Sequence, residues 1–225
     1  MIEKSRRIFL QRAALALAAP ALPSTKSRIH LATNQFPWLT FYAREGRNFN
    51  ADLESSISEV AKSGLDGFEP LVRSPQEIDR LLPLLKKHGL EMRSIYVNTV
   101  LYDPKRIEGS VKHVLSIAQK AKKAGTRIIV TNPSPIRWGG MQDKNDEQLE
   151  IQAKALNDLG EKLKSLGFTL AYHNHDAELR KAAREFHHML VGTNPNYVSF
   201  CLDSHWIFRG AGTVSYTHLT LPTKA

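Results

Sequence analysis

The sequence predicts an α/β protein, an incomplete (β/α)8 barrel in which about six of the eight strand–helix units are present. Three observations lead to this fold. Short β-branched or apolar runs alternate with amphipathic stretches, at intervals of 24 to 41 residues, which favours parallel strands joined by helices. Polar residues follow nearly every apolar run. A glycine-rich nucleotide-binding turn is missing after the first run.

The elements alternate along the chain in a regular order. The strand-like runs cover residues 28–32, 67–72, 91–97, 127–131, 168–173 and 197–203. Helix-like stretches with apolar residues at helical spacing cover residues 53–64, 74–89, 111–125 and 149–167. Each of these four stretches ends at a glycine, the commonest residue just after a helix. The segment 182–190 is also expected to be helical, with His187 and His188 as surface or packing residues.

A barrel explains the polar residues better than an open doubly wound sheet does. The open sheet, in its dinucleotide-binding form, requires G-x-G-x-x-G after the first strand, and "LATNQFPWL" contains no glycine. In a barrel, the loops at the carboxyl ends of many strands build the active site. Polar residues stand at those ends here: Asn34 and Gln35, Glu69, Asn98, Asn132, His173 to Asp176, and Asp203 to His205. We expect a barrel that is cut short after its sixth strand.

The first 26 residues have the layout of a signal peptide. A basic start is followed by an apolar run from Ala13 to Leu22 and by the small residues Ala19-Pro20-Ala21. The stretch "SRRIFLQ", with Arg6 and Arg7, resembles the twin-arginine export motif. An ordinary amphipathic helix is the alternative. We expect a periplasmic or secreted protein that has no membrane segment after the signal is cleaved.

Residues 213–225 break the pattern of the chain. This tail has no apolar periodicity and looks like translated cloning or adaptor DNA, although a genuine disordered tail is the alternative. We therefore expect one domain, residues 27–212, between a signal peptide and a non-native or disordered tail. Cys201 is the one cysteine, which excludes an internal disulfide.

Net charge does not indicate a nucleic-acid partner. The chain carries 31 basic and 22 acidic residues, a net charge of +9. Five basic residues and one acidic residue lie in 1–26, and Lys224 lies in the tail, which leaves +4 for the domain. These charges are scattered along helices, as on solvated helix faces, so no nucleic acid is expected as a partner.

Metal-binding residue types gather after the fifth and sixth strands. In "YHNHDAE", strand alternation places His173 and His175 on one face and Tyr172 on the other. Two imidazoles at a strand end can share a divalent cation, and Asp203 at the next strand could contribute a carboxylate. Spacing alone leaves another interpretation equally open: hydrogen-bonded structural histidines, and an aspartate that caps the next helix.

Three stretches carry a family resemblance: "AYHNHDAE", "VSFCLDSHWIFRGAG" and "DLESSISEVAKSGLDGFEP". Over roughly residues 27–212 the chain resembles the sugar phosphate isomerase/epimerase family. These are xylose isomerase-like TIM barrels, which include relatives of endonuclease IV and inosose dehydratase. The resemblance implies a divalent metal (Mn, Co, Zn or Mg) held at the ends of strands 5 to 8. It also implies acidic groups that move a proton on the carbon next to a carbonyl.

The family's site residues carry over only in part. Asp203 matches the strand-6 aspartate, and His173 stands where many relatives have a metal-binding glutamate, so both are assigned to the metal. A histidine in place of this glutamate puts plain epimerisation in doubt, because the glutamate also moves the proton in the family's epimerases. His175 and Glu178 are assigned catalytic roles. Residues that match pocket positions or follow strand ends are assigned to substrate: Glu69, Asn34, Trp206 and His205.

The resemblance predicts a metal-dependent isomerase, epimerase or related lyase that acts on a small carbohydrate or sugar derivative. The strand-7 histidine and strand-8 glutamate have no counterparts in this sequence, so the chain is expected to be inactive by itself. A non-catalytic carbohydrate-binding protein is the alternative. An endonuclease IV-like activity would need more metal ligands and a basic DNA-binding face, and the export signal and modest charge argue against it.

Overall fold

The structure, a computed structural model, describes residues 29–211. The chain divides after His30, and the elements below belong to the unit that begins at Leu31. The predicted signal peptide and tail lie outside the described residues, so both stay predictions.

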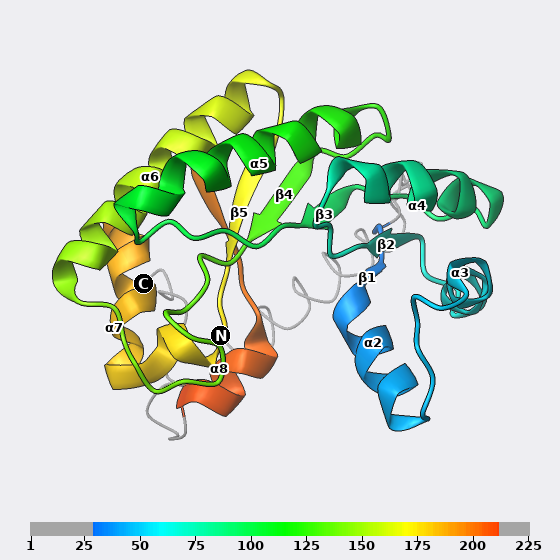
Figure 1. Ribbon diagram of the computed structural model, residues 1–225, viewed down its shortest axis with the longest axis horizontal. Coiled ribbons are helices and arrows are strands. Elements are labelled where there is room, and N and C mark those ends of the chain that lie inside the picture. The colour runs from blue at the N-terminus through cyan, green and yellow to red at the C-terminus, as the bar shows by residue number, and fades with distance from the viewer. Residues whose placement is uncertain (1–28, 212–225) are drawn as a thin grey trace, which may run out of the picture. The chain divides into compact units, whose positions relative to one another are not determined.

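Six short parallel strands form the centre of this unit (Figure 1). Their bounds are β1 Ala32–Asn34, β2 Gly67–Glu69, β3 Ser94–Tyr96, β4 Ile128–Thr131, β5 Thr169–His173 and β6 Val198–Cys201. Strand β1 pairs with β2, while β3, β4, β5 and β6 pair in that order. Isolated bridges, from Gly67 to Glu91 and from Leu71 to Tyr96, connect the two groups.

The order of the strands distinguishes a barrel from an open doubly wound sheet. The strands stand side by side in the order of the sequence, and all are parallel. A doubly wound sheet reverses its strand order at the ligand-binding crevice, whereas a barrel does not. The predicted fold is confirmed: the described residues contain six of the eight strands of a (β/α)8 barrel.

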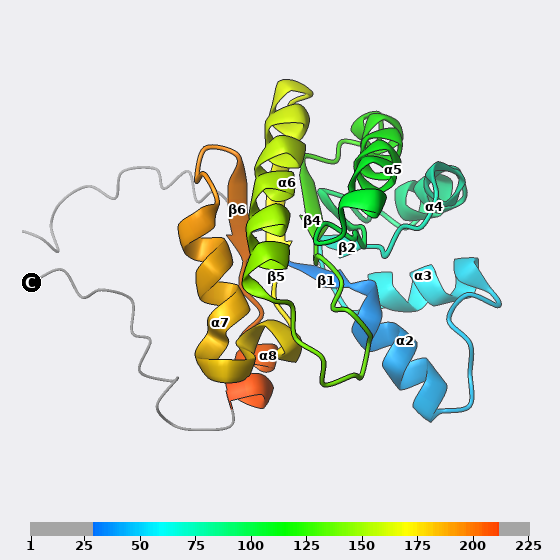
Figure 2. The same ribbon diagram turned by 60° about the vertical axis from the view of Figure 1, so that its left-hand side comes forward.

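Helices cover the outer side of the strands. They are α2 Gln35–Arg44, α3 Leu53–Lys62, α4 Pro75–Lys87, α5 Pro104–Lys122, α6 Asp146–Ser165, α7 Asp176–Gly192 and α8 Ser204–Ala211. From α3 to α8, each helix packs beside the next one in sequence, and α4, α5, α6 and α7 can be followed in this order in Figure 2. Within residues 29–211, no helix is long and apolar enough to cross a membrane.

The sequence did not predict α2, and it placed the first strand too early. Helix α2 has weak apolar periodicity and contains Pro37, but Asn34 caps its start by accepting a hydrogen bond from the Phe36 amide at 3.0 Å. The first strand covers Ala32–Asn34 instead of 28–32. Its position follows from pairing in register with Gly67–Glu69, a long-range contact that no local pattern reveals.

Helix α7 contains a strained turn. Lys181, Ala182 and Ala183 have positive φ values of 49°, 61° and 56°, which interrupt the helix. A left-handed conformation costs an L-residue other than glycine about 1–2 kcal/mol. Such strain persists only where surrounding contacts fix the backbone. Here Arg180 on one side and Arg184 on the other bind the loop that precedes α6.

Candidate active site

His173 and Asp203 lie at the carboxyl ends of neighbouring strands. His173 ends β5 and is buried, and Asp203 follows β6 by two residues. The Nε2 atom of His173 is 3.8 Å from Oδ2 of Asp203. The other oxygen, Oδ1, accepts hydrogen bonds from the amides of His205 at 2.8 Å and Trp206 at 3.2 Å. Asp203 therefore caps α8 with one oxygen and faces His173 with the other.

Asn174 fixes the position of Asp203. Its side chain is fully buried, donates to the Asp203 carbonyl at 3.2 Å and accepts from the Asp203 amide at 2.9 Å. This pair of hydrogen bonds joins the end of β5 to the end of β6. Tyr172 points to the helix layer and contacts Phe186 of α7 and Phe200 of β6, as alternation predicts.

His175 stands between the histidine–aspartate pair and two tryptophans. Its ring centroid is 4.7 Å from that of His173, 5.1 Å from Trp138 and 5.1 Å from Trp206. Burial, aided by the nearby His173, lowers the pKa of His175 to about 4, so the ring is neutral at pH 7. Its Nδ1 atom is buried and forms no full hydrogen bond among residues 29–211, although the ring stands in capping-box position opposite the Glu178 amide at the start of α7. A buried acceptor or donor left in this state is available to a ligand.

Glu178 is fully buried below His175. Its Oε1 atom accepts from the Asn132 side chain at 3.0 Å, and its Oε2 atom accepts from the His175 amide at 2.6 Å. Asn132 also donates to the His173 carbonyl at 2.9 Å. Burial raises the pKa of Glu178. In this geometry Glu178 positions the His175 backbone, and the catalytic role assigned to it from the sequence stays a prediction.

The inner wall of the strands is polar near these residues. Glu69 of β2 accepts a hydrogen bond from the Ser94 hydroxyl of β3, and burial raises the pKa of the Glu69 carboxyl. Tyr96 contacts the His173 ring edge-on, with centroids 5.6 Å apart. Burial, with Glu69 and Asp203 nearby, raises the pKa of Cys201 to about 11. These side chains give the interior of the strands polar groups that a hydroxyl-rich ligand can hydrogen-bond.

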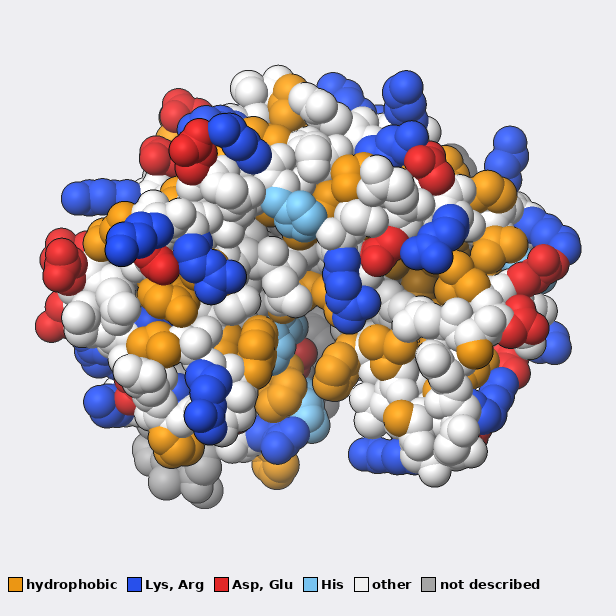
Figure 3. All heavy atoms as spheres, in the orientation of Figure 1, with side chains coloured by type: hydrophobic (Ala, Val, Ile, Leu, Met, Phe, Trp, Pro, Cys, Tyr) orange, Lys and Arg blue, Asp and Glu red, His pale blue; other side chains and the backbone are white. Residues whose placement is uncertain are grey.

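The remaining sequence assignments differ in how near they lie to this centre. Trp206 contacts His175, and exposed His205 packs against Trp206 at a centroid distance of 5.4 Å. Asn34 is exposed and caps α2. The space-filling view shows histidine side chains at a hollow in the surface (Figure 3).

Trp138 is the site residue that sequence reasoning missed. It lies in the loop between β4 and α6, in the stretch "RWGG", where an exposed aromatic beside two glycines was the available signal. A buried ion pair fixes this loop: Lys144 Nζ lies 2.7 Å from Glu185 Oε1 of α7 and donates to the Pro133 carbonyl at 3.0 Å. A second ion pair joins Nε of Arg180 to Oδ1 of Asp143 in the same loop, at 2.8 Å.

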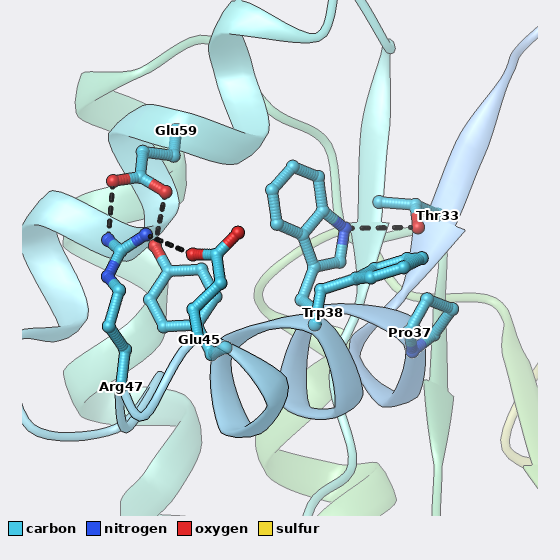
Figure 4. A pocket seen from close by; sticks show the side chains of 8 residues that line it. Thr33, Pro37, Trp38, Glu45, Arg47 and Glu59 are labelled. Carbon is cyan, nitrogen blue, oxygen red and sulfur yellow. Dashed lines mark hydrogen bonds and ion pairs between the residues drawn. The ribbon is translucent and has the colours of Figure 1, made fainter.

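A separate pocket of about 370 Å³ opens between α2 and α3. Figure 4 shows Arg47 between Glu45 and Glu59, with Trp38 and Pro37 on the other side. Arg47 pairs with both carboxylates, at 3.1 Å from Glu45 and 2.7 Å from Glu59. Thr33 of β1 lines this pocket and is in register with Phe68 of β2, a buried core residue. Residues in register on parallel strands point to the same face, so the pocket lies on the helix side of β1. It is therefore not part of the site around His173.

The sequence model of the xylose isomerase-like TIM barrel family matches residues 57–222, more than half of the chain. The chain belongs to this family. The resemblance predicted from the sequence is thereby confirmed, and the parallel strands in sequential order agree with it.

Curated relatives in the family include two inosose dehydratases. The protein from Mesomycoplasma hyopneumoniae (strain 7448) is 27% identical over 172 residues, 72% of this chain and 56% of the relative. The protein from Clostridium perfringens (strain 13 / Type A) is 26% identical over 168 residues, 70% and 56% of the two chains. The chain thus spans little more than half the length of these relatives.

Solved structures of the family share the fold. A sugar phosphate isomerase/epimerase from Parabacteroides distasonis ATCC 8503 superposes with a TM-score of 0.64 and 18% identity, covering 86% of this chain and 71% of the other. A xylose isomerase-like TIM barrel protein from Mycobacterium smegmatis, in complex with magnesium, superposes with a TM-score of 0.57 and 14% identity. The match covers 80% of this chain and 65% of the other. D-psicose 3-epimerase in the presence of D-fructose superposes with a TM-score of 0.58 and 16% identity. The match covers 73% of this chain and 62% of the other.

The residues present fit part of the family's metal site. Neighbouring ligands at about 2.1 Å from one ion lie about 3.0–3.4 Å apart in octahedral or tetrahedral geometry. The 3.8 Å between His173 and Asp203 is slightly longer, so a side-chain shift of about 0.5 Å would let both bind one ion. Burial also lowers the pKa of His173, which keeps its imidazole neutral and able to bind a metal. Within residues 29–211, no three His, Cys, Asp or Glu side chains converge, so the described site supplies two ligands.

Proposed function

We propose that this chain forms part of a divalent-metal-dependent enzyme that isomerises, epimerises or dehydrates a small sugar or sugar derivative. One observation carries the proposal. A neutral buried imidazole and a free carboxylate oxygen lie 3.8 Å apart at the ends of β5 and β6. In a (β/α)8 barrel this end of the strands holds the active site. The dehydratase relatives and epimerase structures support the same class of chemistry.

His173 and Asp203 would hold the metal, whose supplied chemistry is to polarise a carbonyl and a neighbouring hydroxyl of the sugar. Asp203 can bind through Oδ2 without losing the cap that its Oδ1 atom gives to α8. Asn174 keeps that carboxylate in place through two backbone hydrogen bonds. Glu69, on the inner wall, is placed to accept a hydrogen bond from a sugar hydroxyl.

His175 is the proposed proton acceptor. Isomerisation, epimerisation and dehydration each begin by removing a proton from the carbon next to a carbonyl, and a neutral imidazole accepts such a proton. The lowered pKa of His175, about 4, keeps the ring neutral at pH 7 but makes it a weak base, so proton removal also depends on polarisation of the neighbouring carbonyl. Trp138 and Trp206 flank the ring, with centroids 5.1 Å from it on each side.

A second candidate function is carbohydrate binding without turnover. His173 occupies the place of a family glutamate, and Glu178 is fully buried with both oxygens hydrogen-bonded. Neither residue then offers the accessible carboxylate that moves the proton in family epimerases. The tryptophans beside His175 would still contact the apolar face of a sugar ring.

Hydrogen exchange separates the two functions. The protein is incubated with Mn²⁺ and a panel of ketoses and inososes in deuterated water, and deuterium incorporation beside the carbonyl is followed by NMR. Full turnover is not expected with the two metal ligands that residues 29–211 supply. We expect slow exchange into one class of sugar, its loss in His175→Gln, and its retention in His187→Gln on α7. Saturable sugar binding with no exchange in any sugar would instead establish the second function.

Export by the twin-arginine route is also proposed, on the basis of Arg6-Arg7 and the apolar run that follows. A reporter fused after Ser27 should reach the periplasm, and replacing both arginines with lysine should stop it. Unchanged export of the double-lysine variant would rule out this route.

A further inference from the structure

A second pocket lies beside the candidate active site, between the loop after β3 and the first turns of α5. Its volume is about 560 Å³. The lining residues that matter here are Asn98, Arg106, Gly109, Ser110, His113 and Ser134. Two of these side chains are basic, three carry an amide or hydroxyl, and no carboxylate lines the pocket. Such a set of donors selects an anion.

Arg106 is free to bind. It is exposed and forms no ion pair within residues 29–211, unlike Arg47, Arg93, Arg180 and Arg184 of the same unit. The acidic residue on the same helix, Glu108, pairs with Lys112 and not with Arg106. A guanidinium in a polar pocket without a carboxylate partner is suited to a phosphate or carboxylate group.

Gly109 gives the pocket its room. It lies inside α5 with an ordinary helical backbone, and a Cβ added there would meet no atom within 4 Å. Neither packing nor backbone conformation therefore requires glycine, although glycine weakens a helix relative to alanine. The missing side chain leaves open space between Arg106 and His113, which lie one turn before and one turn after it.

The pocket wall is held in place by hydrogen bonds. Ser110 Oγ lies 3.1 Å from both the amide and the carbonyl of Val100, which joins α5 to the loop. The Ser134 amide donates to the Thr99 carbonyl at 2.9 Å, which joins this loop to the one after β4. A wall fixed before binding loses little entropy when a ligand arrives.

The same loops connect the pocket to the candidate active site. Asn98 follows Tyr96 by two residues, and Tyr96 contacts His173. Ser134 follows Asn132 by two residues, and Asn132 donates to the His173 carbonyl. Strands β3 and β5 are separated by one strand, so the loops that follow them start about 10 Å apart.

We propose that this pocket binds an oxyanion, a phosphate or a carboxylate, and that the anion is a substituent of the sugar that reacts at His173 and His175. The assignment of the anion to the substrate rests on the proposed function, whereas the anion site itself rests on the pocket alone. The substrate class is therefore an anionic sugar or sugar acid.

The test uses inorganic phosphate on the full 225-residue chain at constant ionic strength, with acetate as the carboxylate probe. NMR follows the arginine Nε and histidine ring signals. We expect saturable shifts from Arg106 and His113. Binding should weaken about tenfold or more in Arg106→Gln, since a charge-assisted hydrogen bond is lost. Tighter binding of phosphate would identify a sugar phosphate, and tighter binding of acetate a sugar acid.

Two further variants exclude an indirect effect. Gly109→Leu should block the pocket and weaken binding while the thermal midpoint stays the same or rises. Lys112→Gln, on the same helix but outside the pocket, should bind as the unaltered chain does. Shifts that never saturate, or an equal loss in Lys112→Gln, would overturn the anion site. A separate Mn²⁺ titration reports on His173 and Asp203, so either proposal can fail without the other.

Discussion

At the scale of single residues, Asp203 is the helix cap that its sequence position left as one alternative, and its metal-binding role stays a proposal. One oxygen caps α8 and the other faces His173. The orientation of His175 was predictable, because alternation along β5 places it on the face of His173. The contact with Trp138 was not predictable, because Trp138 comes from a loop 37 residues earlier whose path depends on Lys144 and Glu185.

The half-buried carboxyl of Glu69 gives a prediction with a defined pH dependence. Burial raises the pKa of Glu69 in the folded chain, so the folded state binds more protons than the unfolded state between the ordinary pKa and the raised one. The contribution of this group to stability therefore falls as pH rises through that window. Glu69→Gln removes the titration. We expect the variant to be more stable than the unaltered chain at pH 7 and similar to it below pH of about 4.

Urea unfolding at several pH values measures this difference. Glu150→Gln, on the exposed face of α6, controls for the loss of a surface charge. A stability gain of the same size at acidic and neutral pH would show that Glu69 is not a half-buried, titrating carboxyl.

At the scale of elements, the strands and most helices follow from local patterns, whereas the interruption of α7 does not. The predicted strand at 127–131 and the helix ending near Gly167 are both observed, with boundaries shifted by a few residues. No sequence signal marks Lys181 to Ala183 as left-handed, since none is a glycine or an asparagine. Their conformation depends on long-range contacts of the flanking arginines with the loop before α6.

The strained turn predicts an unusual substitution effect. Ala182 is exposed and left-handed, so Ala182→Gly should raise the free energy of unfolding by about 1 kcal/mol. Ala43→Gly in α2 is the matched control and should lower it by about 0.5–1 kcal/mol, as glycine does in a regular helix. Equal destabilisation by both changes, measured in urea, would contradict the left-handed turn.

The loop that carries Trp138 depends on a buried ion pair. Glu185→Leu alone would leave the Lys144 ammonium buried without its partner and should cost about 3–5 kcal/mol. The double variant Lys144→Met/Glu185→Leu should recover most of this loss. Glu108→Gln, which breaks an exposed pair on α5, should change the urea midpoint little. A double variant as unstable as the single one would show that the pair is not what holds the loop.

At the scale of the whole molecule, the six parallel strands in sequential order place the polar ends of β2, β3, β5 and β6 around one interior. This arrangement explains why a strand-by-strand pattern predicted the barrel, whereas the roles of the site residues stay predictions. Within residues 29–211 the structure brings together two metal-binding side chains and not three, so the further ligands that the family resemblance implies stay a prediction. The central claim is therefore that His173 and Asp203 share a cation.

Binding of Mn²⁺ to the 225-residue chain, followed by the loss of the free-ion EPR signal, tests this claim most directly. Asp203→Asn is the sharpest variant, because asparagine also caps helices but lacks the charge that the cation needs. We predict weak saturable binding by the unaltered chain and by His187→Ala, and about tenfold weaker binding by Asp203→Asn and by His173→Gln. Unchanged affinity in Asp203→Asn would contradict the account and leave the histidines with a structural role.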